Sequence, residues 1–305
     1  LKNEVKSLAH KGSIMPGALQ NEMITGREAK IMCLEGEELN EALKTIGGNK
    51  LIEEVEFCLC KFDKQTFEKM VQILLTMERT KELKFVSCWC QEDEDEIWKV
   101  MYKARESWKI SKIEISGRSD LYQVLFNAGS LQDFKCWKSL RDLSLDFASL
   151  IKIIDEEEEY LCFKKLEYLT QLTSLHLNFD YSEIPDERLM NLASQGLKHL
   201  TQLTFLDLNF SDCWLVTDQG VKSLVSHGLK NLTKLILLKL NFYRCEHLTD
   251  KGVKNLVFNG LKYLSQLTSL NLGFSSCNQI TDEGVKNLAF NGLQHLSQLT
   301  SLELN

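Results

Sequence analysis

Four cysteines near the amino end have a spacing that could hold zinc. Cys58 and Cys60 form one Cys-x-Cys pair, and Cys88 and Cys90 form a second. Four thiolates are a common ligand set for structural zinc, but they must converge on a tetrahedron. Cys60 and Cys88 each come three residues after an alternating apolar pair, whereas alternation turns Cys58 to the opposite side. We therefore predict packing positions here and no metal site.

No other combination of residues indicates catalysis. The six histidines form no serine–histidine–aspartate or cysteine–histidine pattern of the kind used for nucleophilic attack. The sequence also has no glycine-rich phosphate loop and no isolated pair of carboxylates. The sequence predicts neither an enzyme nor a bound cofactor.

The residues that must form the framework are paired leucines that recur at a fixed interval. Each pair has the form Leu-x-Leu, whose period of two is typical of a strand with one buried face. The clearest pairs are Leu175/Leu177, Leu206/Leu208, Leu238/Leu240, Leu270/Leu272 and Leu302/Leu304, spaced by 31 or 32 residues. Weaker equivalents are Ile31/Cys33, Val55/Phe57, Leu83/Phe85, Ile113/Ile115 and Leu143/Leu145. This self-similarity predicts about ten stacked repeats, mostly of 28 to 32 residues.

Each regular repeat continues from its strand into a loop and a helix. The loop carries a cysteine and a Thr-Asp pair, which suits the exposed amides and positive dipole of a helix start. A glycine then closes the helix, as at Gly228 and Gly260. A phenylalanine also follows each leucine pair by two residues, and alternation places it in the core. These ladders predict buried rows of cysteine and phenylalanine.

The motif Cys-x-x-[Leu/Val/Ile]-Thr-Asp-x-Gly-Val, which begins at Cys213, Cys245 and Cys277, resembles the leucine-rich-repeat family. The repeat is similar to those of ribonuclease-inhibitor-like arrays and to the cysteine-containing subclass found in F-box proteins. The resemblance implies an α/β solenoid that curves like a horseshoe, with parallel strands on the concave face and helices on the convex face. Two extra residues separate the leucine pair from the cysteine, as in Leu272-Gly-Phe-Ser-Ser-Cys277. We therefore expect a longer strand exit than is usual in the family.

The chain divides by the regularity of its repeats. Residues 1–30 are expected to form an amino-terminal cap or a partial repeat, and residues 31–305 the leucine-rich-repeat domain. Within that domain, residues 31–142 hold degenerate repeats and residues 143–305 regular ones. Because the sequence stops directly after a strand, and solenoid ends normally carry a cap, we expect the array to continue past Asn305.

The outward positions of the later strands are the candidate partner-binding residues. They are Ser174, His176, Asn178, Phe205, Asp207, Asn209, Leu237, Lys239, Asn241, Ser269 and Asn271. Phe205 and Leu237 occupy equivalent positions on neighbouring strands, so they could form an apolar anchor. Isolated apolar side chains are also common on protein surfaces, and the sequence leaves that alternative open.

Charge and composition restrict the class of partner. The net charge is −7, which disfavours nucleic acid, and no apolar run reaches the roughly 18–20 residues needed to span a membrane. Cysteines in packing positions favour reduced thiols in the cytoplasm. The acidic runs 92–96 and 155–159, together with Asp218, Asp250 and Asp282, would lie on one rim. They could steer a basic partner or be ordinary helix-start acids.

These features favour a non-catalytic scaffold or interaction module that binds protein partners through its concave face and acidic rim. We expect it to belong to a larger protein or complex, such as a ciliary, cytoskeletal or ubiquitin-ligase assembly. The resemblance leaves alternatives open. The chain could be a substrate receptor of a ubiquitin ligase, an activator of a small GTPase, or an inhibitor of a basic enzyme.

Overall fold

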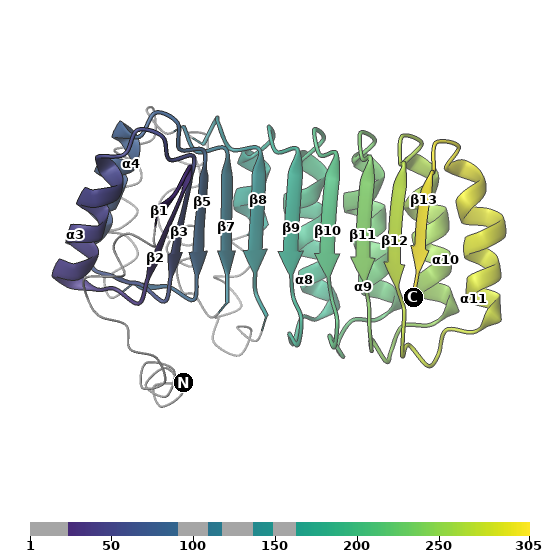
Figure 1. Ribbon diagram of the computed structural model, residues 1–305. Coiled ribbons are helices and arrows are strands. Elements are labelled where there is room, and N and C mark those ends of the chain that lie inside the picture. The colour runs from purple at the N-terminus through teal and green to yellow at the C-terminus, as the bar shows by residue number, and fades with distance from the viewer. Residues whose placement is uncertain (1–23, 91–108, 118–136, 149–162) are drawn as a thin grey trace.

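The described part of the chain forms one long sheet with helices on one side. The computed structural model describes residues 24–90, 109–117, 137–148 and 163–305. Within these ranges the main sheet has eleven strands, in the order β1-β2-β3-β5-β7-β8-β9-β10-β11-β12-β13. Only β1 runs antiparallel to its neighbour, and the other ten strands are parallel. The prediction of about ten parallel strands is confirmed (Figure 1).

The strands of the main sheet are β1 (Ile24–Thr25), β2 (Glu28–Met32), β3 (Glu54–Cys58), β5 (Glu82–Val86), β7 (Lys112–Ser116), β8 (Asp142–Asp146), β9 (Ser174–Asn178), β10 (Phe205–Asn209), β11 (Leu237–Asn241), β12 (Ser269–Gly273) and β13 (Ser301–Leu304). Two short strands, β4 (Lys61–Phe62) and β6 (Trp89–Cys90), pair separately. The helices are α3 (Gly36–Gly47), α4 (Lys64–Thr76), α8 (Asp186–Asn191), α9 (Asp218–Ser223), α10 (Asp250–Asn259) and α11 (Asp282–Asn287). Short helical turns continue α8, α9 and α11 to Gly196, Gly228 and Gly292.

The leucine pairs face the helices, as their alternation predicts. From β9 to β12 both members of each pair are at most 1% exposed. Leu302 and Leu304 of β13, the last strand, are 42% and 43% exposed. The first predicted pair has a different register. Ala29 and Ile31 pair with Val55 and Phe57, whereas Cys33 is exposed and has a left-handed backbone. The predicted pair Ile31/Cys33 is therefore wrong by two residues. The true first inward residue is Ala29, whose small side chain does not stand out as a core residue in the sequence. The strand β2 also starts before the expected boundary at residue 31.

The helices lie behind the strand row, and α3 and α11 lie outside its two ends (Figure 1). The helical layer is therefore wider than the strand layer. Parallel strands stack about 4.8 Å apart, whereas packed helices need about 8–10 Å. The strand face is accordingly the concave side of the solenoid.

The predicted phenylalanine ladder is confirmed as a buried stack. Phe147, Phe179, Phe210, Phe242 and Phe274 follow one another with ring centroids 5.1, 5.3, 5.4 and 5.9 Å apart. The first four rings are at most 2% exposed. Offset stacking of aromatic rings adds to the stabilisation from burial, so this stack links each of these repeats to the next.

The predicted row of buried cysteines is also present. The thiols of Cys213, Cys245 and Cys277 donate to the carbonyls of Phe179, Phe210 and Phe242 in the preceding repeats, at 3.0, 3.2 and 2.9 Å. Burial raises the pKa of Cys213 to about 12 and also raises the pKa of the other two thiols. Seven cysteines are described as free thiols, these three among them.

Two cysteines of the Cys-x-Cys pairs, Cys60 and Cys88, fill the same slot in earlier repeats. Cys60 donates to the carbonyl of Ile31 at 3.5 Å and Cys88 to that of Phe57 at 3.2 Å. The side chain of Cys90 lies outside the described residues. Among the residues that the structure describes, no group of histidines, cysteines and acids is placed to hold a metal ion.

The Thr-Asp pair binds one repeat to the next. The hydroxyls of Thr217, Thr249 and Thr281 cap their helices by accepting a backbone N–H. Each threonine is also bound by the aspartate of the preceding repeat, whose side chain crosses the boundary between the two repeats. The Asp218 carboxylate accepts the Thr249 N–H at 2.9 Å and its hydroxyl at 2.6 Å. The motif also needs its glycine, because a Cβ at Gly252 would lie 2.5 Å from Asp218 Oδ1.

Asp218→Ala should reduce the free energy of unfolding by about 1–3 kcal/mol, because the amide and hydroxyl of Thr249 lose their acceptor. Urea unfolding followed by circular dichroism measures this change. Asp282→Ala is the matched control, since Asp282 occupies the same helix position but accepts no hydrogen bond from the described residues. The control should cost at most about 1 kcal/mol from the helix dipole. Equal losses in both variants would contradict a role between repeats.

Candidate binding site on the strand face

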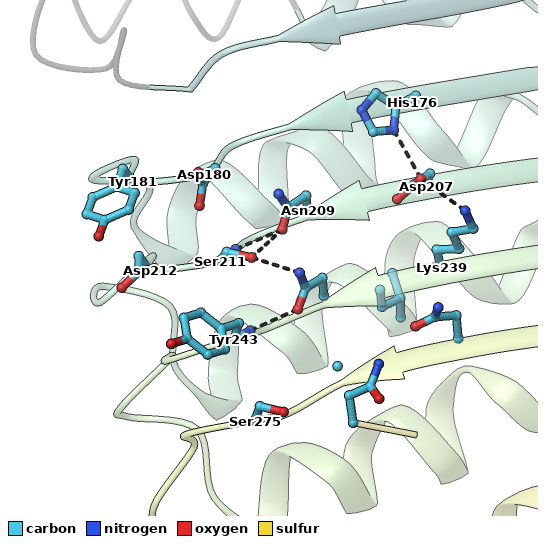
Figure 2. Close-up of a pocket in the computed structure, with 15 residues that line it drawn as sticks. His176, Asp180, Tyr181, Asp207, Asn209, Ser211, Asp212, Lys239, Tyr243 and Ser275 are labelled. Carbon is cyan, nitrogen blue, oxygen red and sulfur yellow. Dashed lines mark hydrogen bonds and ion pairs between the residues drawn. The ribbon is translucent and has the colours of Figure 1, made fainter. Parts of the chain in front are cut away.

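A hollow of about 700 Å³ lies on the strand face over β9–β12. Its lining residues come from the strands and from the loops that leave them (Figure 2). They are His176, Asp180, Tyr181, Asp207, Asn209, Ser211, Asp212, Lys239, Leu240, Asn241, Tyr243, Asn271, Gly273, Ser275 and Asn305. Most of these side chains carry polar groups, and two tyrosines stand at the edge of the hollow.

Six of the predicted partner-binding residues line this hollow: His176, Asp207, Asn209, Lys239, Asn241 and Asn271. Asn178 lies beside it and supports its floor. The other four, Ser174, Phe205, Leu237 and Ser269, form one row at the start of the strands and do not line the hollow. The outward face was therefore assigned correctly, but the hollow lies toward the carboxyl ends of the strands.

Phe205 and Leu237 are adjacent, as predicted, because the parallel register pairs them directly. Both are half-buried. The Lys239 ammonium lies 5.9 Å from the centroid of the Phe205 ring, within reach of a cation–π interaction. The Phe205 ring therefore has a charged side chain beside it, and the apolar anchor stays a prediction.

Sequence reasoning missed the loop residues of the hollow. Asp180, Ser211, Tyr243 and Ser275 occupy one position of the repeat, directly after the stacked phenylalanines. Each phenylalanine and the residue after it are the two extra residues noted in the sequence. By alternation the phenylalanine enters the core and the next side chain turns outward. The two inserted residues therefore have separate roles: the phenylalanine joins the core stack, and the residue after it lines the hollow. Because the insertion is visible in the sequence, these lining residues could have been predicted.

A chain of hydrogen bonds fixes the floor of the hollow. Asn178 Nδ2 donates to Asp146 Oδ1 at 2.9 Å, and Asn209 Nδ2 donates to Asn178 Oδ1 at 2.8 Å. Ser211 then bridges Asn209 and Asn241, with bonds of 2.6 and 2.8 Å (Figure 2). Because each amide is held by its neighbours, these side chains form a rigid surface.

Charges inside the hollow are paired except at one position. The Asp207 carboxylate lies 3.2 Å from His176 Nδ1 and 3.9 Å from Lys239 Nζ. The Asp212 carboxylate lies 2.7 Å from the Arg244 guanidinium. Asp180 has no side-chain hydrogen bond or ion pair with any residue that the structure describes. Burial, together with the charges of Asp212 and Asp146, raises its pKa.

The strand face of the earlier repeats has a different character. Its charged side chains pair with each other across neighbouring strands, as Lys30 does with Glu56 at 2.7 Å and Lys112 with Glu82 at 3.2 Å. Lys84 pairs with Glu54 in the same way. These groups are satisfied within the sheet. Of the acidic rim suggested by the sequence, runs 92–96 and 155–159 lie outside the described residues.

A parallel sheet that gains one strand and one helical segment with each repeat defines a solenoid repeat protein. The family model described as "Leucine Rich repeat" matches residues 199–225 and 264–289. The chain is built of leucine-rich repeats. Comparison with curated protein sequences gives no match.

Several solved structures are similar in outline. A chain of the yeast Rad7–Elc1 complex is 19% identical with a TM-score of 0.45, over 87% of this chain and 66% of that one. This chain thus spans slightly less than two thirds of it. A protein from Bacteroides fragilis is 14% identical, with a TM-score of 0.49 and coverage of 100% and 81%. An internalin from Listeria monocytogenes is 14% identical, with a TM-score of 0.29 and coverage of 99% and 93%. Similarity at this level says nothing of function.

The helices of the described ranges are all too short or too polar to cross a lipid bilayer.

Asp207→Asn should reduce stability more at about pH 5.5 than at about pH 8.5. The hydrogen bond to Asp207 raises the pKa of His176, with smaller contributions from Asp146 and Glu114. A raised histidine pKa contributes stability below about pH 6.5 that is lost as the pH rises through the folded value. Urea unfolding at the two pH values measures the difference. His176→Gln should remove the same pH dependence, and an equal loss for Asp207→Asn at both values would contradict the pairing.

Proposed function

We propose that this chain is a non-catalytic protein-interaction module that binds an extended segment of a partner protein in the hollow over β9–β12. The observation that carries the proposal is the hollow itself, a rigid polar surface edged by exposed tyrosines on the concave side of the sheet. Interfaces are enriched in tyrosine, and recognition surfaces work best when they are preorganised.

The shape and chemistry of the hollow favour a peptide over a small molecule. Small-molecule sites are concave and mostly apolar, whereas this hollow is open and lined by carboxylates, amides and hydroxyls. Its side chains offer donors and acceptors at regular intervals along several strands. An extended backbone repeats its own donors and acceptors in a similar way, so it can bind along such a row.

We further propose the cytoplasm as the place where the chain acts. The buried cysteines that donate to backbone carbonyls do so as thiols. Oxidation would remove these donors from the repeat boundary, so a reducing compartment suits the packing.

Ser275→Trp should abolish partner binding or weaken it on the order of tenfold, since the indole would occupy the hollow without removing a side-chain hydrogen bond of the floor. Affinity capture from an extract of the source cells, followed by titration of the recovered partner, measures this. Ser265→Trp is the matched control, because Ser265 is also exposed but lies before β12 and outside the hollow.

The control should bind as the original chain does. Phe205→Asp/Leu237→Asp, in a chain of confirmed folding, then tests whether the starts of the strands extend the surface. If Ser275→Trp and Ser265→Trp recover the same partner equally well, the partner does not bind in the hollow and the proposal fails.

A further inference from the structure

The hollow holds three carboxylates, and two of them already have cations. Asp207 lies between His176 and Lys239, and Asp212 contacts Arg244. Only Asp180 has no charged or hydrogen-bonding partner for its carboxylate among the residues that the structure describes. The unpaired charge is therefore a single group at a defined place, and it lines the hollow.

The position of Asp180 is fixed by its own backbone. Its N–H donates to Asn178 Oδ1 at 3.2 Å, and that amide belongs to the hydrogen-bonded floor. The side chain is half-buried. Burial and the nearby charges of Asp212 and Asp146 raise the pKa of Asp180, so ionisation of this carboxyl group costs more here than in water. A cation at this point would relieve that cost.

Two exposed tyrosines flank this end of the hollow. Tyr181 directly follows Asp180, and Tyr243 leaves β11 two repeats later. Figure 2 shows both rings at the same end as Asp180 and Asp212. The Tyr181 N–H donates to the Ser211 carbonyl at 3.0 Å, and the Tyr243 N–H to Asn241 Oδ1 at 3.1 Å, so both loops are fixed to the framework. Aromatic faces attract cations and stack on planar ones.

We propose that an arginine side chain of the bound segment occupies this end of the hollow, with its guanidinium paired to Asp180 and contacting the rings of Tyr181 and Tyr243. This inference rests on the proposed function and names the chemistry of the partner. Guanidinium suits the place better than ammonium, because it is planar, forms bidentate bonds with a carboxylate, and stacks on aromatic rings.

Selection of short random peptides on the immobilised full chain tests the inference. Peptides that also bind the Ser275→Trp variant are discarded, which leaves those that need the hollow. The retained peptides should share an arginine. Replacing it with citrulline, its neutral isostere, should weaken binding about ten- to hundredfold, the range for hydrogen bonds to charged groups. Replacement with lysine should also weaken binding measurably.

Asp180→Asn should cause the same loss, and the effect should not add to that of citrulline, as expected for two groups that contact each other. The melting temperature of this variant should equal or exceed that of the original chain, because the change removes an unfavourable charge. Asp282→Asn, an equal change of charge on the exposed start of α11, should leave peptide binding unchanged.

The outcomes separate the two proposals. If no peptide depends on the hollow, the proposed function fails. If peptides depend on the hollow but tolerate citrulline, lysine or Asp180→Asn without loss, only the arginine inference is overturned. Additive effects of citrulline and Asp180→Asn would also overturn it, since the two groups would then act at separate places.

Discussion

The in-register pairing of parallel strands is the constraint on which the rest of the structure depends. Leu206 pairs with Leu238, and Leu238 pairs with Leu270, without any stagger. Equivalent residues of successive repeats therefore stand in straight rows about 4.8 Å apart. A residue type that recurs at one position of the repeat therefore forms a row of identical side chains. Each side chain in such a row must pack well against its copies in the neighbouring repeats.

Different rows join neighbouring repeats by different interactions, from the core to the surface. In the core, phenylalanines stack on each other, and cysteine thiols bond to carbonyls of the preceding repeat. At the helix starts, an aspartate carboxylate accepts hydrogen bonds from the backbone N–H and the hydroxyl of the threonine in the next repeat. On the sheet, amide side chains form a hydrogen-bonded chain. Because each repeat completes its bonds only with its neighbours, stability is shared along the array.

The hollow arises where the rows are interrupted. In the row of Asn178, Asn209 and Asn241, the next repeat carries Gly273, where a Cβ would lie 2.4 Å from Asn241 Oδ1. In the loop row, Asp180 and Tyr243 replace the small serines of the neighbouring repeats. Regular positions thus provide the rigid floor, and irregular ones provide the features that a partner can recognise.

Periodicity in the sequence was enough to determine the solenoid, the buried rows and the outward face. Alternation within a strand shows which side chains face inward, and its recurrence at a fixed interval shows that the strands stack. It failed at Ala29 and Ile31, where the small alanine was not recognised as the first member of the pair. The partner-binding role of the outward residues stays a prediction. Only the tertiary structure showed that Asp218 reaches Thr249 and that Lys239 lies over Phe205. It also showed that, of the three carboxylates in the hollow, Asp180 alone has no cation among the described residues. These facts depend on side chains from different repeats, whose distances are set by the stacking and cannot be read from one repeat.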